Sequence, residues 1–97
     1  MTRHAFIVSY DITDDRRRRE VYDICRGFGE RVQYSVFRCH LDETERIELQ
    51  VEIEGAINHL DDQVLFIDIG PVEGRAKHCV RAIGRGHDPP DDGPVFL

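Results

Sequence analysis

The apolar residues of this chain fall into short alternating runs and two longer stretches with helical spacing. The first run, residues 4–10, is rich in β-branched and aromatic residues and stops at Asp11. Such a run predicts a buried strand. Residues 63–69 form a similar run that Gly70 and Pro71 close, and residues 77–83 form a weaker one. We therefore expect strands in all three places.

Residues 13–29 have the pattern of an amphipathic helix. Four apolar residues share the spacing i, i+3, i+4 and i+7, which places them on one helical face: Val21, Ile24, Cys25 and Phe28. Residues 13–15 are of helix-capping types, and Gly27 and Gly29 supply stop signals.

Residues 30–41 alternate as a strand does, but their apolar side changes partway. One side carries Val32, Tyr34 and Val36, whereas the other carries Phe37, Cys39 and Leu41. This change predicts a bend, a bulge or two short strands. We expect the ring of Tyr34 in the core, because aromatic residues within a strand are more often buried.

Residues 42–60 give two conflicting signals. Asp42 followed by Glu45 resembles a capping box that opens a helix. Four residues alternate as in a strand, but five follow helical spacing: Leu49, Ile53, Ala56, Ile57 and Leu60. The larger set favours a helix, although Gly55 within it costs about 1 kcal/mol relative to alanine.

The resulting order of elements is β-α-β-β-α-β. It predicts an α+β fold of the ferredoxin-like type, a sandwich with an added C-terminal strand. We expect residues 1–86 to form the domain. Residues 87–94 form a polar, proline-bearing linker, and the apolar residues 95–97 that follow are expected to dock on a partner.

Composition narrows the classes of function. The chain has 97 residues, which suits one domain, and its formal net charge is −6. The charge is uneven, since residues 1–40 carry eight arginines and six acids, whereas residues 41–97 carry five basic and thirteen acidic residues. Arginine presents a planar fork of donors that fits phosphate. The basic half therefore predicts a local phosphate-binding site.

Cysteine usage and hydropathy indicate a cytoplasmic protein. The three cysteines are an odd number without metal-site spacing, which favours a reducing compartment. The first apolar run is too short for a signal peptide, and no stretch approaches the length of a membrane span.

Asp11 is the candidate residue for metal-dependent chemistry. It follows the first strand, at the carboxyl end where ligands often bind. A carboxylate there suits Mg²⁺, or Mn²⁺ in its place, because Mg²⁺ takes one or two carboxylates and leaves room for water and phosphate oxygens. Such an ion activates water. The alternative is an aspartate that only begins a turn.

Basic residues follow Asp11 directly. Four consecutive arginines occupy the first turns of the predicted helix: Arg16, Arg17, Arg18 and Arg19. The N-terminus of a helix disfavours cations, so phosphate contact explains the placement, while local ion pairs are the alternative. Arg31 and Arg38 flank Tyr34 and Phe37, a mixture that suits a surface for phosphates and bases.

Two stretches together resemble a known family, the small CRISPR-associated adaptation protein, family two of the Cas proteins. They are FIVSYDITDDRRRREV, residues 6–21, and GERVQYSVFRCHL, residues 29–41. VLFIDIG, residues 64–70, and the closing VFL agree more loosely. The resemblance implies a ferredoxin-like protomer in which residues 30–41 form two short strands. It also implies a homodimer whose C-terminal strands pair with the partner's sheet.

The resemblance further implies a function. Members of the family are described as metal-dependent endonucleases on RNA or double-stranded DNA, and as the central dimer of the complex that integrates new spacers. The two Asp11 carboxylates of a dimer would share the metal ion. The residues that match the motif of the family are Tyr10 and Asp11, then Arg18, then Arg31, Ser35 and Phe37. The family can have a basic residue where this chain has Glu20.

Two hypotheses follow. In the first, the chain is a Mg²⁺-dependent endonuclease in which Asp11 is catalytic, Tyr10 positions the phosphate, and Arg18 and Arg31 neutralise it. In the second, a non-catalytic dimer grips duplex DNA through the same arginines and bridges a partner integrase. A third and weaker alternative is a small-molecule regulatory domain, which the arginine run disfavours.

Overall fold

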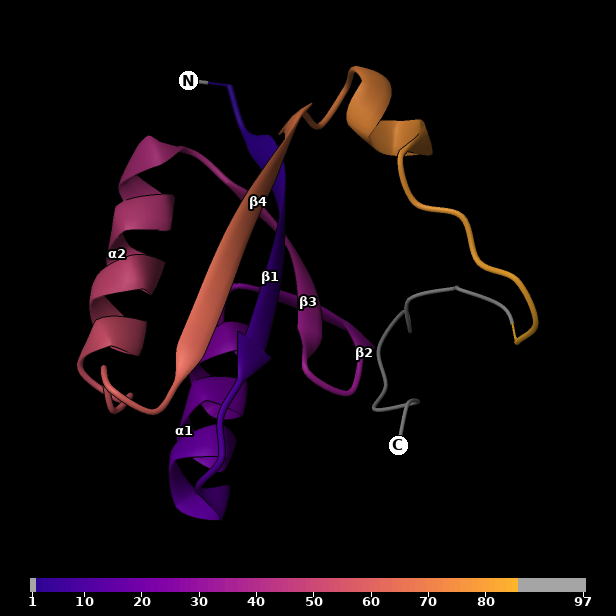
Figure 1. Cartoon of the computed structure of the whole chain (residues 1–97). Coiled ribbons are helices and arrows are strands. Elements are labelled where there is room, and N and C mark those ends of the chain that lie inside the picture. Colours follow the sequence, from indigo (N-terminus) through magenta and orange to yellow (C-terminus); the bar gives the residue numbers. More distant parts are fainter. Residues whose placement is uncertain (1, 86–97) are drawn as a thin grey trace.

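The computed structural model describes residues 2–85 and has the predicted α+β architecture (Figure 1). Four strands form one antiparallel sheet in the order β2-β3-β1-β4. The strands are β1 (His4–Asp11), β2 (Gly29–Gln33), β3 (Val36–Leu41) and β4 (Gln63–Pro71). Helix α1 (Asp15–Arg26) follows β1, helix α2 (Glu43–Glu54) follows β3, and a short 3₁₀ helix, η1 (Arg75–His78), follows β4. This order is the split β-α-β plan of ferredoxin-like folds.

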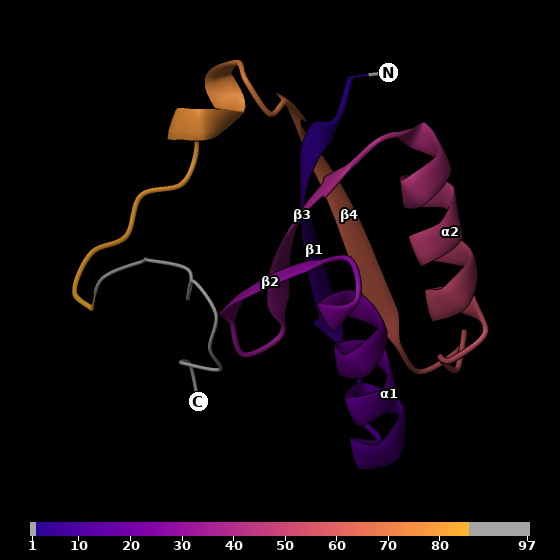
Figure 2. The same ribbon diagram turned by 180° about the vertical axis from the view of Figure 1, so that it is seen from behind.

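Both helices cover the same face of the sheet, as the two opposite views show (Figures 1 and 2). We call this the covered face. Its core contains alternate residues of the strands and the inner residues of both helices: Phe6, Val8, Tyr10, Val21, Cys25, Phe37, Cys39, Leu41, Leu49 and Ile53. The period of two in the strands and the helical spacing in α1 predicted these positions.

The helix ends confirm most of the predicted capping. Asp14 is the N-cap of α1 and accepts a hydrogen bond from the Arg17 amide at 2.9 Å. Asp42 and Glu45 form the complete capping box of α2. The expectation that Gly55 lies within α2 is wrong, because the helix ends at Glu54 and Gly55 is its C-cap. Glycine suits that place, since it costs a helix least at its end.

The stretch from Gly29 to Leu41 forms two short strands, one of the three alternatives for its change of face. A two-residue turn, Tyr34 and Ser35, separates the paired residues Gln33 and Val36. The expectation that Tyr34 lies in the core is wrong, since its side chain is 70% exposed. Side chains alternate between the two faces only within a strand. Tyr34 lies in the turn, so this alternation does not predict its burial.

The predicted strand at residues 77–83 is also wrong. Gly70, whose φ of 101° lies in the left-handed region, lies where the register of β4 against β1 shifts, and residues 75–78 beyond β4 form η1. Only Ala76 of η1 is buried, and its carbonyl accepts a hydrogen bond from Arg38 at 2.9 Å. A strand needs backbone partners, and within residues 2–85 this segment pairs with none.

The face of the sheet opposite the helices is apolar and partly exposed. We call it the open face. In β4, Leu65 and Ile67 are 47% and 46% exposed, and Ile67 pairs with Ile7 of β1. The predicted linker and apolar tail, residues 87–97, lie outside the described residues. Among those that are described, no helix has the length and apolar character that crossing a membrane requires.

Candidate functional site

Asp11 is the last residue of β1, and its side chain is exposed. It pairs with Gln63 of β4, at the end of the sheet where the chain leaves for α1. Successive side chains of a strand point to opposite faces. Tyr10 belongs to the core of the covered face, so Asp11 belongs to the open face. Neighbours in the sequence thus serve different surfaces.

Tyr10 is a buried residue that borders a surface hollow. Only 5% of it is exposed, and its ring stacks on Phe37 at a centroid distance of 6.3 Å. Burial raises the pKa of its hydroxyl to about 12, so Tyr10 is protonated at neutral pH. Its amide donates a hydrogen bond to the Ser35 carbonyl at 3.1 Å, which ties the β2–β3 turn to β1.

Arg17 holds α1 against the loop before β4. Its Nε lies 2.8 Å from Oδ2 of Asp62, whose side chain has no exposed surface. The hydrogen bond from Arg17 is the main reason that the pKa of Asp62 falls to about 2, and the Asn58 amide adds a second donor at 2.9 Å. Arg17 is therefore an anchor of the fold, and its guanidinium is already engaged.

The other three residues of the arginine run differ from one another. Arg18 donates from Nη1 to the Ile12 carbonyl at 3.1 Å and forms an ion pair with Asp15, so it fixes the backbone beside Asp11. Arg19 pairs with Asp23 at 3.3 Å while its side chain stays 75% exposed. Arg16 is exposed and forms no ion pair with any residue from 2 to 85.

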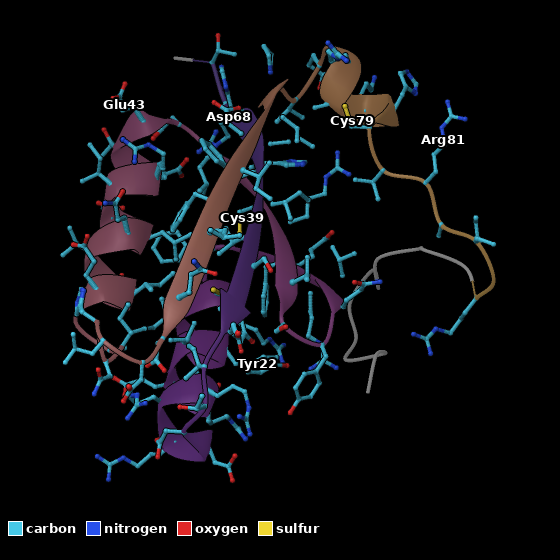
Figure 3. All side chains as sticks on the ribbon, in the orientation of Figure 1. Tyr22, Cys39, Glu43, Asp68, Cys79 and Arg81 are labelled. Carbon is cyan, nitrogen blue, oxygen red and sulfur yellow. The ribbon has the colours of Figure 1, made fainter. Side chains whose placement is uncertain are left out.

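Beside Tyr10 lies a hollow of about 450 Å³, which we call the arginine–tyrosine pocket. It is lined by Tyr10, Asp15, Arg18, Arg19, Tyr22, Asp23, Arg26, Arg31 and Tyr34. The ring of Tyr22, a residue of α1 that Figure 3 labels, lies between the arginines of the pocket. The guanidinium carbons of Arg19, Arg26 and Arg31 lie 5.9, 5.9 and 5.4 Å from its ring centroid, within cation–π range.

The pocket includes five residues that sequence reasoning did not assign to a site: two acidic residues, Asp15 and Asp23, and then Tyr22, Arg26 and Tyr34. The signal for two of them was in the sequence, since Arg18, Tyr22 and Arg26 are four residues apart and share one side of a helix. The position of Tyr34 had no such signal, because it depends on the two-residue turn.

Two predicted contact residues of the β2–β3 hairpin, Ser35 and Phe37, are less exposed than Tyr34. Phe37 has no exposed surface in this structure. Phe37 instead supports the pocket from beneath, edge-on to Tyr22 at 5.6 Å. Ser35 is partly buried, and its carbonyl takes part in the hydrogen bond to Tyr10.

A metal ion would find few ligands within one copy of the chain. Among residues 2–85, no group of three or more histidine, cysteine or acidic side chains is arranged to hold a metal ion. If Asp11 binds a metal ion, one copy of the chain would supply it with a single carboxylate. Mg²⁺ accepts one or two protein carboxylates, so two copies of Asp11 would suit it.

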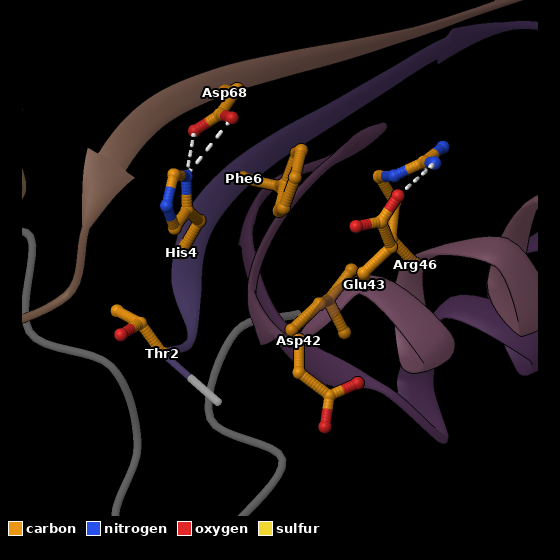
Figure 4. Close-up of a pocket in the computed structure, with 8 residues that line it drawn as sticks. Thr2, His4, Phe6, Asp42, Glu43, Arg46 and Asp68 are labelled. Carbon is orange, nitrogen blue, oxygen red and sulfur yellow. Dashed lines mark hydrogen bonds and ion pairs between the residues drawn. The ribbon is translucent and has the colours of Figure 1, made fainter.

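A second hollow, of about 280 Å³, lies at the opposite end of β1 (Figure 4). Here Nδ1 of His4 is 2.9 and 3.0 Å from the two oxygens of Asp68. The Gly70 amide and then His4 lower the pKa of Asp68. Arg46 lies 3.9 Å from Glu43. In this hollow Asp68 faces an imidazole and Glu43 faces one guanidinium, whereas four arginines line the arginine–tyrosine pocket.

Comparison with known proteins agrees with this architecture. A relative from Geobacter sulfurreducens, named a CRISPR-associated endoribonuclease Cas2, is 43% identical over 89% of this chain and 90% of its own length. A solved structure of a hypothetical protein from Thermus thermophilus superposes with a TM-score of 0.76 at 33% identity, over 91% of this chain and 99% of that one. The solved Cas2 of Streptococcus pyogenes gives 0.72 at 26% identity, over 82% and 99%.

The family model described as CRISPR associated protein Cas2 matches residues 4–74. That span contains β1, Asp11, the arginine run, the β2–β3 hairpin and the whole of β4. The chain therefore belongs to the CRISPR associated protein Cas2 family.

Proposed function

We propose that this chain is a metal-dependent endonuclease of a CRISPR system that works as a homodimer, with Asp11 of both subunits at its active centre. Its relatives carry the name endoribonuclease, which supports cleavage of phosphodiester bonds. The observation that carries the proposal is the position of Asp11. It is an exposed carboxylate at the end of β1, on the open face, which neither α1 nor α2 covers.

The open face supports a dimer. Leu65 and Ile67 keep nearly half of their surface exposed in a sheet that is otherwise well packed on its other side. Exposed apolar patches of this kind mark interaction sites. A two-fold interface places the same patch of both subunits together. We propose that the two-fold axis passes near this end of β1, so that the two copies of Asp11 face each other.

Two copies of Asp11 fit the ligand needs of Mg²⁺ or Mn²⁺. When bound, such an ion lowers the pKa of a coordinated water and neutralises charge at phosphorus. One Asp11 per subunit leaves several positions for water and phosphate oxygens. Because a single protomer offers one carboxylate, we propose that activity requires the dimer.

The other residues position Asp11 and the substrate. Arg18 holds the Ile12 carbonyl at 3.1 Å, so it fixes the loop that follows Asp11. The Arg17–Asp62 pair fixes the start of α1 beside it. Arg31 and Arg18 both line the arginine–tyrosine pocket, where guanidinium groups would bind backbone phosphates. Tyr10, buried and protonated, supports the wall of that pocket.

The test compares wild type with Asp11→Asn on single-stranded RNA and on duplex DNA, with Mg²⁺ present. We expect Asp11→Asn to lower the cleavage rate by at least about 100-fold, the scale on which loss of a charge-stabilising group acts. Glu52→Gln is the matched control, since Glu52 is an exposed carboxylate on α2, which packs on the covered face, whereas Asp11 belongs to the open face. Cleavage by Asp11→Asn at the wild-type rate would refute the proposal.

The exposed side of α1 supports a second candidate, a dimer that bridges duplex DNA to a partner integrase. Arg16 and Arg19 present guanidiniums to solvent in consecutive turns. Contacts to backbone phosphates carry no sequence information and weaken as salt rises. For Arg16→Ala, which lies outside the arginine–tyrosine pocket, we expect weaker duplex binding and a weaker dependence of that binding on salt, with cleavage of a short RNA retained. Unchanged duplex affinity would remove this candidate.

A further inference from the structure

We propose that the arginine–tyrosine pocket binds one unpaired base of a single-stranded nucleic acid, with the ring of Tyr34 as its stacking surface. This inference rests on the proposed function only in taking nucleic acid as the ligand. It adds a selectivity, because a pocket for one base accepts a single strand and excludes a closed duplex.

The size and walls of the pocket fit one nucleotide. Its volume of about 450 Å³ lies within the usual range for small-ligand sites. Tyr22 and Tyr34 line it together with four arginines. Aromatic rings and guanidinium planes are the surfaces on which unpaired bases stack.

Tyr34 is the residue that most needs an explanation. Its side chain is 70% exposed although it is a large ring, and it lines the pocket from the β2–β3 turn. The turn is held in place, because the adjacent Ser35 carbonyl accepts a hydrogen bond from the Tyr10 amide at 3.1 Å. An exposed ring on a fixed turn is ready to stack on a base with little loss of entropy.

The charge of the pocket favours an anion. Arg18 pairs with Asp15 and Arg19 pairs with Asp23, so two of the four arginines are matched by carboxylates of the lining. Within the described part of the chain, Arg26 contacts the hydroxyl and the ring of Tyr22 and no carboxylate. A phosphate beside the base would be bound by the guanidinium of Arg26.

The geometry points to an unpaired base rather than to a duplex. In a duplex each base is stacked on both sides and paired, so it reaches a side pocket only after extrusion. A single strand supplies a free base together with its flanking phosphate. RNA and DNA strands share this chemistry, and the test below separates them.

The test measures binding by fluorescence anisotropy with EDTA in place of metal. The probes are a short labelled single strand, as RNA and as DNA, and the same backbone with every base replaced by an abasic residue. We expect the wild type to bind the base-bearing strand about 5- to 150-fold more tightly than the abasic strand, the range for stacking of one base. If only RNA or only DNA shows this ratio, that strand is the ligand.

Tyr34→Ala should abolish this ratio and leave affinity for the abasic strand unchanged, whereas Tyr34→Phe should keep it, because phenylalanine retains the stacking ring. A Tyr34→Ala protein that keeps the wild-type ratio would overturn the proposal. So would a shift of Tyr34→Ala to a smaller species in sedimentation, since Tyr34 would then be a subunit contact. Asp11→Asn should keep the ratio of the two affinities. Base binding can therefore be confirmed even if the proposal of nuclease activity fails.

Discussion

The two faces of the sheet differ in how far the chain completes them. The covered face is closed by α1 and α2, and residues such as Phe37 and Leu49 have no exposed surface. The open face is also apolar, but Leu65 and Ile67 remain nearly half exposed. The covered face is fully packed within one chain. The open face keeps exposed apolar side chains, as a protein interface does.

The comparison explains why Tyr10 and Asp11 have different roles although they are adjacent. Strand alternation places Tyr10 under the arginine–tyrosine pocket of the covered face, and it places Asp11 with the open face. The proposed substrate pocket and the proposed metal ligand would thus lie on opposite surfaces of β1. A dimer through the open face would leave the pocket accessible.

The largest expected effect is the loss of stability when a buried ring of the covered face is removed. Phe37→Ala should lower the free energy of unfolding by about 3–5 kcal/mol, because it removes a buried ring and leaves a cavity. Tyr34→Ala, three residues away and exposed, should change it by less than about 0.5 kcal/mol. Urea titrations followed by circular dichroism measure both. Equal losses would mean that the hairpin is placed wrongly.

These two residues also show what the sequence reveals. The alternation of Phe37, Cys39 and Leu41 predicted β3 and its buried side, because burial in a strand repeats every second residue. The same rule failed at Tyr34, since a two-residue turn breaks the period. Whether residues 30–41 bend, bulge or turn depends on pairing with β1, which is a tertiary effect that local pattern does not encode.

The candidate site was also predictable only where local sequence pattern places its residues. Asp11 was recognised from its place after a strand, and the arginine run from its charge. The role of Arg17 was not, because Asp62, its partner, is 45 residues away. The predicted strand at residues 77–83 failed since strands need neighbours, and a single sequence does not show which edges are free.

A charge on the open face should break the dimer and leave the fold intact. Ile67→Glu buries a carboxylate in the proposed interface, so we expect dimer affinity to fall by at least about 100-fold. Ile47→Glu is the matched control, because Ile47 on α2 has the same exposed fraction of 46% as Ile67. Sedimentation velocity over a range of concentrations separates the two. A dimer unaffected by Ile67→Glu would place the interface elsewhere.

Acid should weaken the anchor between α1 and the loop before β4. The pKa of Asp62 is about 2 in the fold, below its ordinary value of 3.8, so the folded state favours the charged form. The Arg17–Asp62 contribution is therefore full above pH 3.8 and is lost as the pH falls toward 2. Asp62→Asn should flatten this part of the stability–pH curve, whereas Asp61→Asn should not. An unchanged slope in Asp62→Asn would contradict the pairing.

The smallest effect concerns thiol reactivity, which leaves stability unchanged. Cys25 and Cys39 are buried in the covered face, and burial raises the pKa of each thiol to about 12. Cys79 is exposed. At pH 8, a thiol reagent should modify Cys79 alone in the folded protein and all three after denaturation. Rapid modification of Cys25 in the folded state would mean that the covered face opens.

Mixing of subunits tests the central claim, that one active centre needs Asp11 from two protomers. Wild-type and Asp11→Asn chains would be unfolded together in equal amounts, refolded and assayed for cleavage at saturating Mg²⁺. If both carboxylates of a two-fold dimer are needed, only dimers with two wild-type chains cleave, and about one quarter of the wild-type activity per dimer remains. If each subunit carries a complete site, about one half remains, and that result would contradict the shared active centre.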